Sequence, residues 1–375
     1  QRAERELAWV RQSGQYPLMG RGDTNLYAVF AERGRRLLGR KGRLGLVVPS
    51  GIATDQTTSA FFADLIETQT LGALLDFENR AGVFADVHRS FKFSIVSLTG
   101  GERKDEVTCG FFLHGPDHLA DPERVFALRP ADCALMNPNT RTCPVFRTRR
   151  DYELTRAIYE RVPVLVRETE GGDENPWGVR YHTMFHMTND SGLFRTAAEL
   201  EADGFWLADG NVWRKGPEAY LPLYEGKMVQ MFDHRAASVF VNPANLHRPA
   251  LPRPTTAAEW ADPAYSPTPQ FWVDGAEVQR RLRGCASGWF VAFKDVTAPT
   301  NARTTIAAAV PRCAMGNKVP VLLPGVQAAA PMAALLANLC SFVLDFVARQ
   351  KVGGQTLNWF IVKQLPVLPP SSYEE

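Results

Sequence analysis

The stretch from residue 44 to residue 93 constrains the fold most, because apolar runs of strand length alternate there with polar connections. Glycine precedes the first run and a proline closes it, which is typical of a buried strand, here predicted to be parallel. The elements expected are a strand at 44–48, a helix carrying the apolar residues of 61–66, and strands at 71–77 and 91–98. Together they indicate part of an α/β sheet.

A polar connection, residues 78–90, joins the last two of these strands and carries the first candidate site residues. Open α/β sheets bind ligands at the carboxyl ends of their strands, where such loops lie. This loop contains Phe84 together with Arg80, His88 and Arg89. Residue type alone leaves two readings open for each: Phe84 is a ligand contact or a core phenylalanine, and the other three are functional or simply solvated.

Composition narrows the function classes only a little. A chain of 375 residues with 45% hydrophobic residues is long enough for two domains with cores of their own. The net charge of +2 says little about partners, because nucleic-acid binding needs clustered basic residues. Such clusters occur at 33–43, 147–150 and 279–283, and each can equally be a solvated helix face.

Cysteine and histidine usage favours neither a metal site nor a disulfide framework. The six cysteines are scattered and form no Cys-x-x-Cys pair, which predicts a reducing, cytoplasmic setting. His182 and His186 are four residues apart, but no third ligand lies nearby and the segment looks like β structure, so no metal is expected.

No apolar run has the length of a membrane span, so no membrane partner is expected either.

Three separated motifs resemble one family. They are Asn-Leu-Tyr-Ala-Val-Phe at 25–30, Gly-Arg-Leu-Gly-Leu-Val-Val-Pro at 42–49, and Asp-Phe at 76–77 followed by Val-Phe at 83–84. In this order they resemble the later motifs of adenine-N6 DNA methyltransferases, nearest to the fused enzymes of type IIG restriction–modification and phage-defence systems. The resemblance implies that Phe84 stacks on an adenine flipped out of the duplex. An aromatic face replaces the stacking that the flipped base loses.

The resemblance also implies that part of the catalytic domain lies elsewhere. The family binds S-adenosylmethionine with a glycine-rich turn and holds the adenine amine with an Asn-Pro-Pro-aromatic motif, and neither occurs here. Residues 137–140 and 175–178 resemble the second motif only superficially. We therefore expect S-adenosylmethionine to be bound mainly by an upstream methyltransferase half and this chain to be inactive alone. Whether an endonuclease domain is a further partner is left open by the sequence.

Beyond about residue 128 the chain has proline- and glycine-rich loops and many aromatic residues, which predicts mixed, mostly β structure. Residues 221–235, 293–306 and 351–357 resemble the TaqI-like target-recognition domain of the same enzymes. With Arg80, His88 and Arg89, the residues that this resemblance places on double-stranded DNA are Lys227, Gln230, His234, Arg235, Lys294, Arg303 and Lys351. The alternative for 225–235 is a structural hinge, in which a Glu225–Lys227 or an Asp233–Arg235 ion pair fixes one domain on the other.

The complete expectation is an α/β region, the back half of a Rossmann-like S-adenosylmethionine-dependent domain at 1–130, followed by a target-recognition domain at 131–375. A helix over 332–350 with a broad apolar face is predicted near its end. The competing hypothesis is a DNA-specificity module without catalytic activity. An unrelated α/β enzyme ranks last, because no nucleophile elbow, phosphate loop or zinc signature is present.

Overall fold

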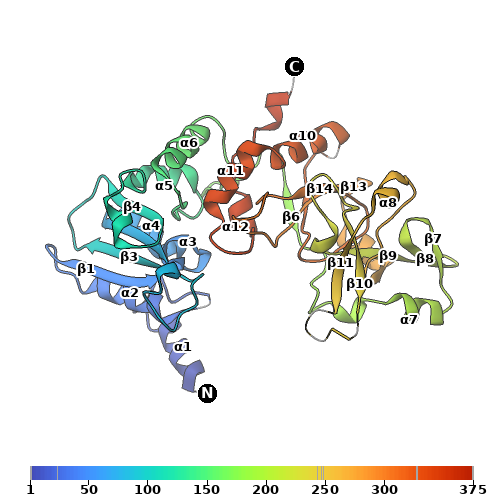
Figure 1. Ribbon diagram of the computed structural model, residues 1–375, viewed down its shortest axis with the longest axis horizontal. Coiled ribbons are helices and arrows are strands. Elements are labelled where there is room, and N and C mark those ends of the chain that lie inside the picture. Colours follow the sequence, from blue (N-terminus) through green and yellow to red (C-terminus); the bar gives the residue numbers. More distant parts are fainter. Residues whose placement is uncertain are drawn as a thin grey trace. The chain divides into compact units, whose positions relative to one another are not determined.

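The computed structural model describes residues 2–22, 24–242, 244–245, 247, 249–326 and 328–373. The chain is a mixed α/β protein with several sheets, and its contacts divide it into two compact units, Gln1–Glu174 and Asn175–Glu375 (Figure 1). The predicted boundary was at residue 130. The contacts place the boundary after residue 174, because residues 131–174 pack against the residues before them. Tyr152, for example, stacks on Phe126 with ring centroids 5.6 Å apart. What each predicted domain does stays a prediction.

The first unit is built on one five-stranded sheet with strand order β1-β3-β2-β4-β5. The strands are β1 (Arg43–Pro49), β2 (Leu71–Glu78), β3 (Lys92–Thr99), β4 (Val107–Leu113) and β5 (Val125–Leu128). The helices are α1 (Arg2–Gln12), α2 (Leu26–Arg36), α3 (Gly51–Thr54), α4 (Ser59–Glu67), α5 (Pro130–Met136) and α6 (Arg149–Tyr159). The helix predicted around 61–66 is confirmed, since α4 buries its four large apolar side chains.

The first strand differs from its prediction. β1 pairs antiparallel with β3, which also pairs antiparallel with β2, so β1 and β2 run in the same direction with β3 between them. Only Val48 of β1 is buried, and Val47 is 59% exposed. The expectation of a buried, parallel strand is therefore wrong for this chain. β1 is less buried than predicted because it lies at the edge of the sheet: among the described residues no strand pairs with its outer side.

The second unit contains two larger sheets and a two-stranded ribbon. The sheet orders are β12-β9-β8-β7, with β15 beside β9, and β14-β13-β16-β6; β10 and β11 form the ribbon. The strands are β6 (Arg180–His182), β7 (Trp206–Ala208), β8 (Val212–Lys215), β9 (Glu218–Tyr224), β10 (Ala237–Val241), β11 (Ala250–Pro254), β12 (Trp272–Asp274), β13 (Trp289–Phe293), β14 (Ala307–Pro311), β15 (Ala314–Met315) and β16 (Val321–Leu323). The core between them includes Phe185, Leu223 and Phe290, all fully buried.

Short helices connect these strands and close the chain: α7 (Ala197–Ala202), α8 (Ala257–Ala261), α9 (Gly275–Arg281), α10 (Ala329–Leu339), α11 (Phe342–Lys351) and α12 (Trp359–Val362). The single helix predicted over 332–350 is wrong, because α10 and α11 meet at a 55° bend. Ser341 starts the new helix by accepting the backbone N–H of Leu344 at 3.1 Å. The predicted apolar face holds only in part beyond the bend, since Phe342 is 80% exposed whereas Val347 is fully buried.

None of the helices in the described part of the chain is, by itself, long and apolar enough to cross a membrane. The bent pair α10 and α11 meets the length and composition criteria only when both helices are taken together.

Candidate functional site

The loop after β2 is held in one shape by a buried asparagine. Asn79 is 1% exposed, and its Nδ2 donates to the carbonyls of Phe84 at 2.9 Å and Val87 at 2.8 Å. Its Oδ1 accepts the backbone N–H of Phe84 at 3.0 Å. These bonds satisfy backbone groups that no strand or helix pairs. The loop is therefore ordered before any ligand arrives.

Phe84 is presented at the surface by this loop. Its ring is 42% exposed and rests edge-on against Phe93, with the centroids 5.0 Å apart and the planes at 90°. Phe93 in turn stacks on buried Phe77 at 5.4 Å. The alternative of an ordinary core phenylalanine does not hold, because much of the ring is accessible. A role in stacking stays a prediction.

Further apolar side chains surround Phe84 on the same loop. Val83 is 60% exposed, Val87 41% and Phe91 62%. The sequence analysis made none of the three a candidate site residue, although apolar residues in an otherwise polar connection were a visible signal. The loop thus exposes apolar side chains, Phe84 among them, and such a surface is suited to a flat, uncharged ligand face.

A buried carboxylate lies at the same edge of the sheet. The register aligns Val48 of β1, Ser94 of β3 and Asp76 of β2 in one row, and Ser50 follows just beyond β1. Asp76 is 2% exposed, and its Oδ1 accepts hydrogen bonds from Ser94 Oγ at 3.0 Å and from Ser50 Oγ. Its Oδ2 has no hydrogen-bond partner among the described residues. Burial raises the pKa of Asp76, and the bond from Ser50 opposes the rise.

A lysine and an aromatic ring accompany this carboxylate. The ammonium of Lys92 lies 4.0 Å from the ring centroid of Phe112, and the guanidinium of Arg147 lies 4.2 Å from the same centroid. Burial lowers the pKa of Lys92, while the charge of Asp76 opposes that shift. Phe112 has a left-handed backbone, φ 54°, where β4 ends. Strained residues of this kind concentrate at ligand sites.

The three basic residues predicted on the loop lie at the surface. Arg80 pairs through Nε with Glu78 at 2.6 Å, and His114 reaches the same carboxylate at 3.1 Å. His88 shares a hydrogen bond of 2.8 Å between its Nδ1 and Ser90 Oγ. Arg89 is exposed. The structure thus gathers Phe84, Arg80, His88 and Arg89 on one loop, and their contact with DNA stays a prediction.

In the second unit, Lys227 and Lys294 come together although 67 positions separate them in the sequence. Both line one cavity with a volume of about 330 Å³. Lys227 pairs with Glu225 at 3.0 Å, the ion pair that the hinge alternative predicted. Gln230 is exposed, and its backbone N–H donates to the carbonyl of Asp233 at 2.8 Å.

His234 and Arg235 both contact other groups of the second unit. Burial lowers the pKa of His234, whose ring lies 6.3 Å from that of Tyr224. Arg235 donates to the carbonyls of Trp260, Asp262 and Tyr265. Its guanidinium fastens a loop, and its contact with DNA stays a prediction. Asp233 accepts the backbone N–H of Arg235 at 2.7 Å, so that link is a turn contact in place of the predicted ion pair.

Arg303 and Lys351 also make internal contacts. The Arg303 guanidinium donates to the carbonyl of Cys340 at 3.0 Å and covers the ring of Phe342 at 4.0 Å. Lys351 is 8% exposed, and its Nζ donates to the carbonyl of Gln364 at 2.6 Å. Lys351 therefore lies in the interior, and its predicted contact with DNA is not one that this structure presents.

The two histidines considered for a metal belong to different local structures. His182 ends strand β6, as the predicted β character requires, and the Nδ1 of His186 accepts the backbone N–H of Thr188 at 3.3 Å. In the described ranges no group of three or more His, Cys, Asp and Glu residues is placed to hold a metal. All six cysteines are buried thiols.

Comparisons with known proteins give no family assignment. No family model matches the chain, and no curated protein matches it. Among solved structures, a type IIL restriction–modification enzyme, MmeI, in complex with DNA has a TM-score of 0.44 at 12% identity, covering 89% of this chain and 39% of that one. The type IIG restriction endonuclease BpuSI has a TM-score of 0.33 at 11% identity, covering 98% of this chain and 45% of that one.

The structure of a DrdV–DNA complex has a TM-score of 0.35 at 10% identity, covering 85% of this chain and 33% of that one. This chain therefore spans less than half the length of each of these three proteins. Likenesses this weak carry no argument about activity, so the function is argued from the residues of this chain.

Proposed function

We propose that this chain is part of a site-specific DNA methyltransferase that transfers a methyl group from S-adenosylmethionine to N6 of adenine in duplex DNA, in a restriction–modification or phage-defence system. The observation that carries the proposal is Phe84, a 42% exposed ring on a loop pinned by Asn79, at the position that the sequence resemblance assigns to adenine stacking. Its partner is double-stranded DNA.

The loop has the physical properties that base flipping needs. Extruding a base costs a few kcal/mol, and stacking on an aromatic ring returns about 1–3 kcal/mol per base. Asn79 already orders the backbone of Phe84, so little conformational entropy is lost when a base arrives. Phe93 supports the ring from one side and leaves the rest of it accessible. This chain's part in the reaction is to hold the base in place.

The cofactor belongs mainly to another segment in this proposal. S-adenosylmethionine supplies the methyl group, and the motifs that bind it in the resembling family do not occur in these residues. The open outer edge of β1, with Val47 exposed, suits the addition of further strands. On α2, Leu26 is 72% exposed and Phe30 69%, so this helix also offers apolar surface to such a segment.

A methyl-transfer assay tests the proposal. The natural protein containing this chain, with labelled S-adenosylmethionine and duplex DNA, should yield N6-methyladenine. Phe84→Ala in that protein should lower the rate, and the isolated chain should give no product. Methylation by the isolated chain, or a product methylated on cytosine only, would contradict the proposal.

The alternative is a DNA-specificity module without catalytic activity of its own. The observation in its favour is the lysine-lined cavity of the second unit, which needs no cofactor to contact DNA. This alternative predicts that the isolated chain binds duplex DNA and that Phe84→Ala leaves methylation by the natural protein unchanged.

A further inference from the structure

Three chain segments of the second unit enclose the cavity of about 330 Å³. Each follows the end of a strand: residues 225–227 come after β9, residues 294–296 after β13 and residues 316–318 after β15. Met187 supplies an apolar wall. Cavities of this size are large enough for a small ligand.

The strand pairing explains why these segments meet. β15 runs parallel to β9, so their carboxyl ends coincide, and Gly316 N donates to the carbonyl of Tyr224 at 2.9 Å. Asp295 N donates to the carbonyl of Lys318 at 3.2 Å, which attaches the third segment. A side chain at Gly226 would place its Cβ 3.1 Å from that carbonyl, tighter than ordinary contact. The backbone around the cavity is therefore closely packed.

The charges around the cavity do not balance. Lys227 pairs with Glu225 at 3.0 Å, and Lys318 pairs with Asp295 at 2.7 Å. Lys294 has no ion-pair partner among the described residues, and burial lowers its pKa. Three ammonium groups against two carboxylates leave one positive charge at the half-buried Lys294.

The two carboxylates do not block an anion. Oε1 of Glu225 and Oδ1 of Asp295, the oxygens not bonded to lysine, are covered by protein. A ligand in the cavity therefore meets ammonium groups and not free carboxylate oxygens. An unpaired, partly desolvated ammonium is costly, and an anion beside it removes much of that cost.

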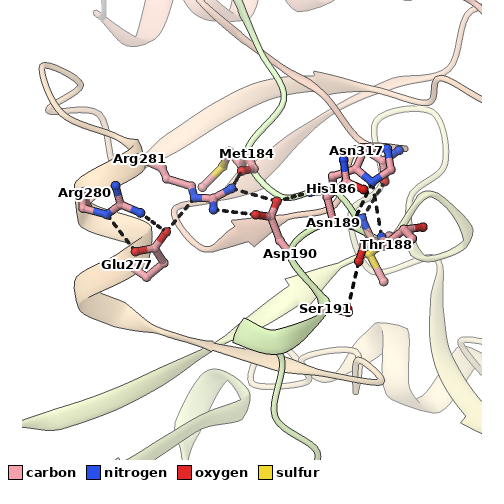
Figure 2. A network of polar contacts seen from close by, with 11 residues as sticks. Met184, His186, Thr188, Asn189, Asp190, Ser191, Glu277, Arg280, Arg281 and Asn317 are labelled. Atoms are coloured by element: carbon pink, nitrogen blue, oxygen red, sulfur yellow. Dashed lines mark hydrogen bonds and ion pairs between the residues drawn. The ribbon is translucent and has the colours of Figure 1, made fainter.

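The wall that carries Met187 is fixed by a polar network (Figure 2). Arg281 donates two hydrogen bonds to Asp190, at 2.9 and 3.1 Å, and Asp190 Oδ2 accepts the backbone N–H of His186 at 2.6 Å. Met187 N donates to Asn317 Oδ1 at 3.3 Å. The loop is thus tied both to α9 and to the segment that carries Lys318, and the cavity is preformed.

We propose that this cavity binds a single phosphate group, held by the Lys294 ammonium with Lys227 and Lys318 beside it. Under the function proposed above, on which this step rests, the group is one phosphodiester of the DNA backbone. Its single negative charge balances the single uncompensated positive charge. Such a contact positions the protein on DNA without reading the sequence.

DNA binding by the whole chain tests the phosphodiester. The affinity for a short mixed-sequence duplex is measured against salt concentration for wild type, Lys294→Gln, Lys294→Arg and the control Lys215→Gln. Lys215 belongs to the same unit but lies outside the cavity. Lys294→Gln should reduce the slope of log affinity against log salt by about one and weaken binding about eightfold at 0.1 M salt. Lys294→Arg should restore both values, and Lys215→Gln should change neither.

Inorganic phosphate distinguishes the source of the group. Phosphate should raise the melting temperature of the wild type relative to chloride at equal ionic strength, and Lys294→Gln should abolish that increase. If phosphate raises the melting temperature of the wild type but Lys294→Gln leaves DNA affinity unchanged, the result supports a free phosphate as the ligand. No difference between Lys294→Gln and wild type in either assay overturns the site. If wild type fails to bind DNA at low salt, the proposed function fails. The phosphate assay then still decides whether the cavity binds a phosphate group.

Discussion

Asn79 holds the backbone of Phe84 at both of its polar groups: its Nδ2 donates to the Phe84 carbonyl at 2.9 Å and its Oδ1 accepts the Phe84 N–H at 3.0 Å. An accessible ring near the sheet edge is thereby attached to one of the least exposed side chains of the unit. An asparagine can serve a donor and an acceptor at once, which neither aspartate nor alanine can do.

Asn79→Ala should therefore destabilise the first unit and loosen the loop. The change removes the three hydrogen bonds between Asn79 and the backbone of Phe84 and Val87, which costs about 1–3 kcal/mol. Urea unfolding should show this loss, and limited proteolysis should cut residues 79–91 faster than in wild type. Exposed Arg89→Ala in the same loop is the control and should change neither result. Equal stability of Asn79→Ala and wild type would mean that the asparagine does not order the loop.

Asp76→Asn should change how stability depends on pH. Burial raises the pKa of Asp76 above its ordinary value of 3.8, so the folded state binds more protons than the unfolded state between those two pKa values. The free energy of unfolding of wild type thus falls as pH rises through that window. The asparagine variant does not lose stability in this way, so it should gain stability relative to wild type as pH rises from 3.8 through the raised pKa of Asp76. A stability difference that is constant over this range would contradict the assignment.

Lys351→Met should leave DNA binding unchanged, because this lysine lies inside the second unit. Burial holds its pKa well below 10.5, so the wild-type fold gains stability as pH rises through the window between the lowered pKa and 10.5. The methionine variant should lose that dependence. Its salt slope for DNA should equal that of wild type. A smaller slope would restore Lys351 as a DNA contact.

Arg281→Lys should weaken the second unit, since lysine cannot reproduce the two parallel hydrogen bonds to Asp190. Loss of charge-assisted hydrogen bonds at this half-buried position should cost about 1–3 kcal/mol. The melting temperature measures the loss, and Arg214→Lys on exposed β8 provides the control. A variant as stable as wild type would show that the network does not hold the loop of Met187.

Local patterns were enough to predict three strands of the first sheet, β1, β2 and β3, together with α4 and the loop that carries Phe84. Patterns could not show that β1 is exposed, because burial of a strand depends on what covers it. The apolar spacing of 332–350 runs on through Ser341, so it concealed the bend between α10 and α11. Long-range partners were equally hidden: the carbonyls that occupy Arg235 lie 25 to 30 residues away in the sequence.

The same limit applies to the cavity of the second unit. Lys227 and Lys294 were each proposed for DNA from local resemblance, but nothing in the sequence brings them to one cavity with Lys318. These lysines come together because β15 pairs in parallel with β9, and this pairing joins segments about 90 positions apart in the sequence.

The central claim is that Phe84 stacks on a base extruded from duplex DNA. The most direct test compares the affinity of this chain for a matched duplex and for one with a mismatched or abasic site, in wild type, Phe84→Ala and the exposed control Phe30→Ala. The flippable site should bind more tightly, and Phe84→Ala should remove about 1–3 kcal/mol of that gain while Phe30→Ala keeps it. Equal affinity of Phe84→Ala and wild type for the flippable site would contradict the stacking role.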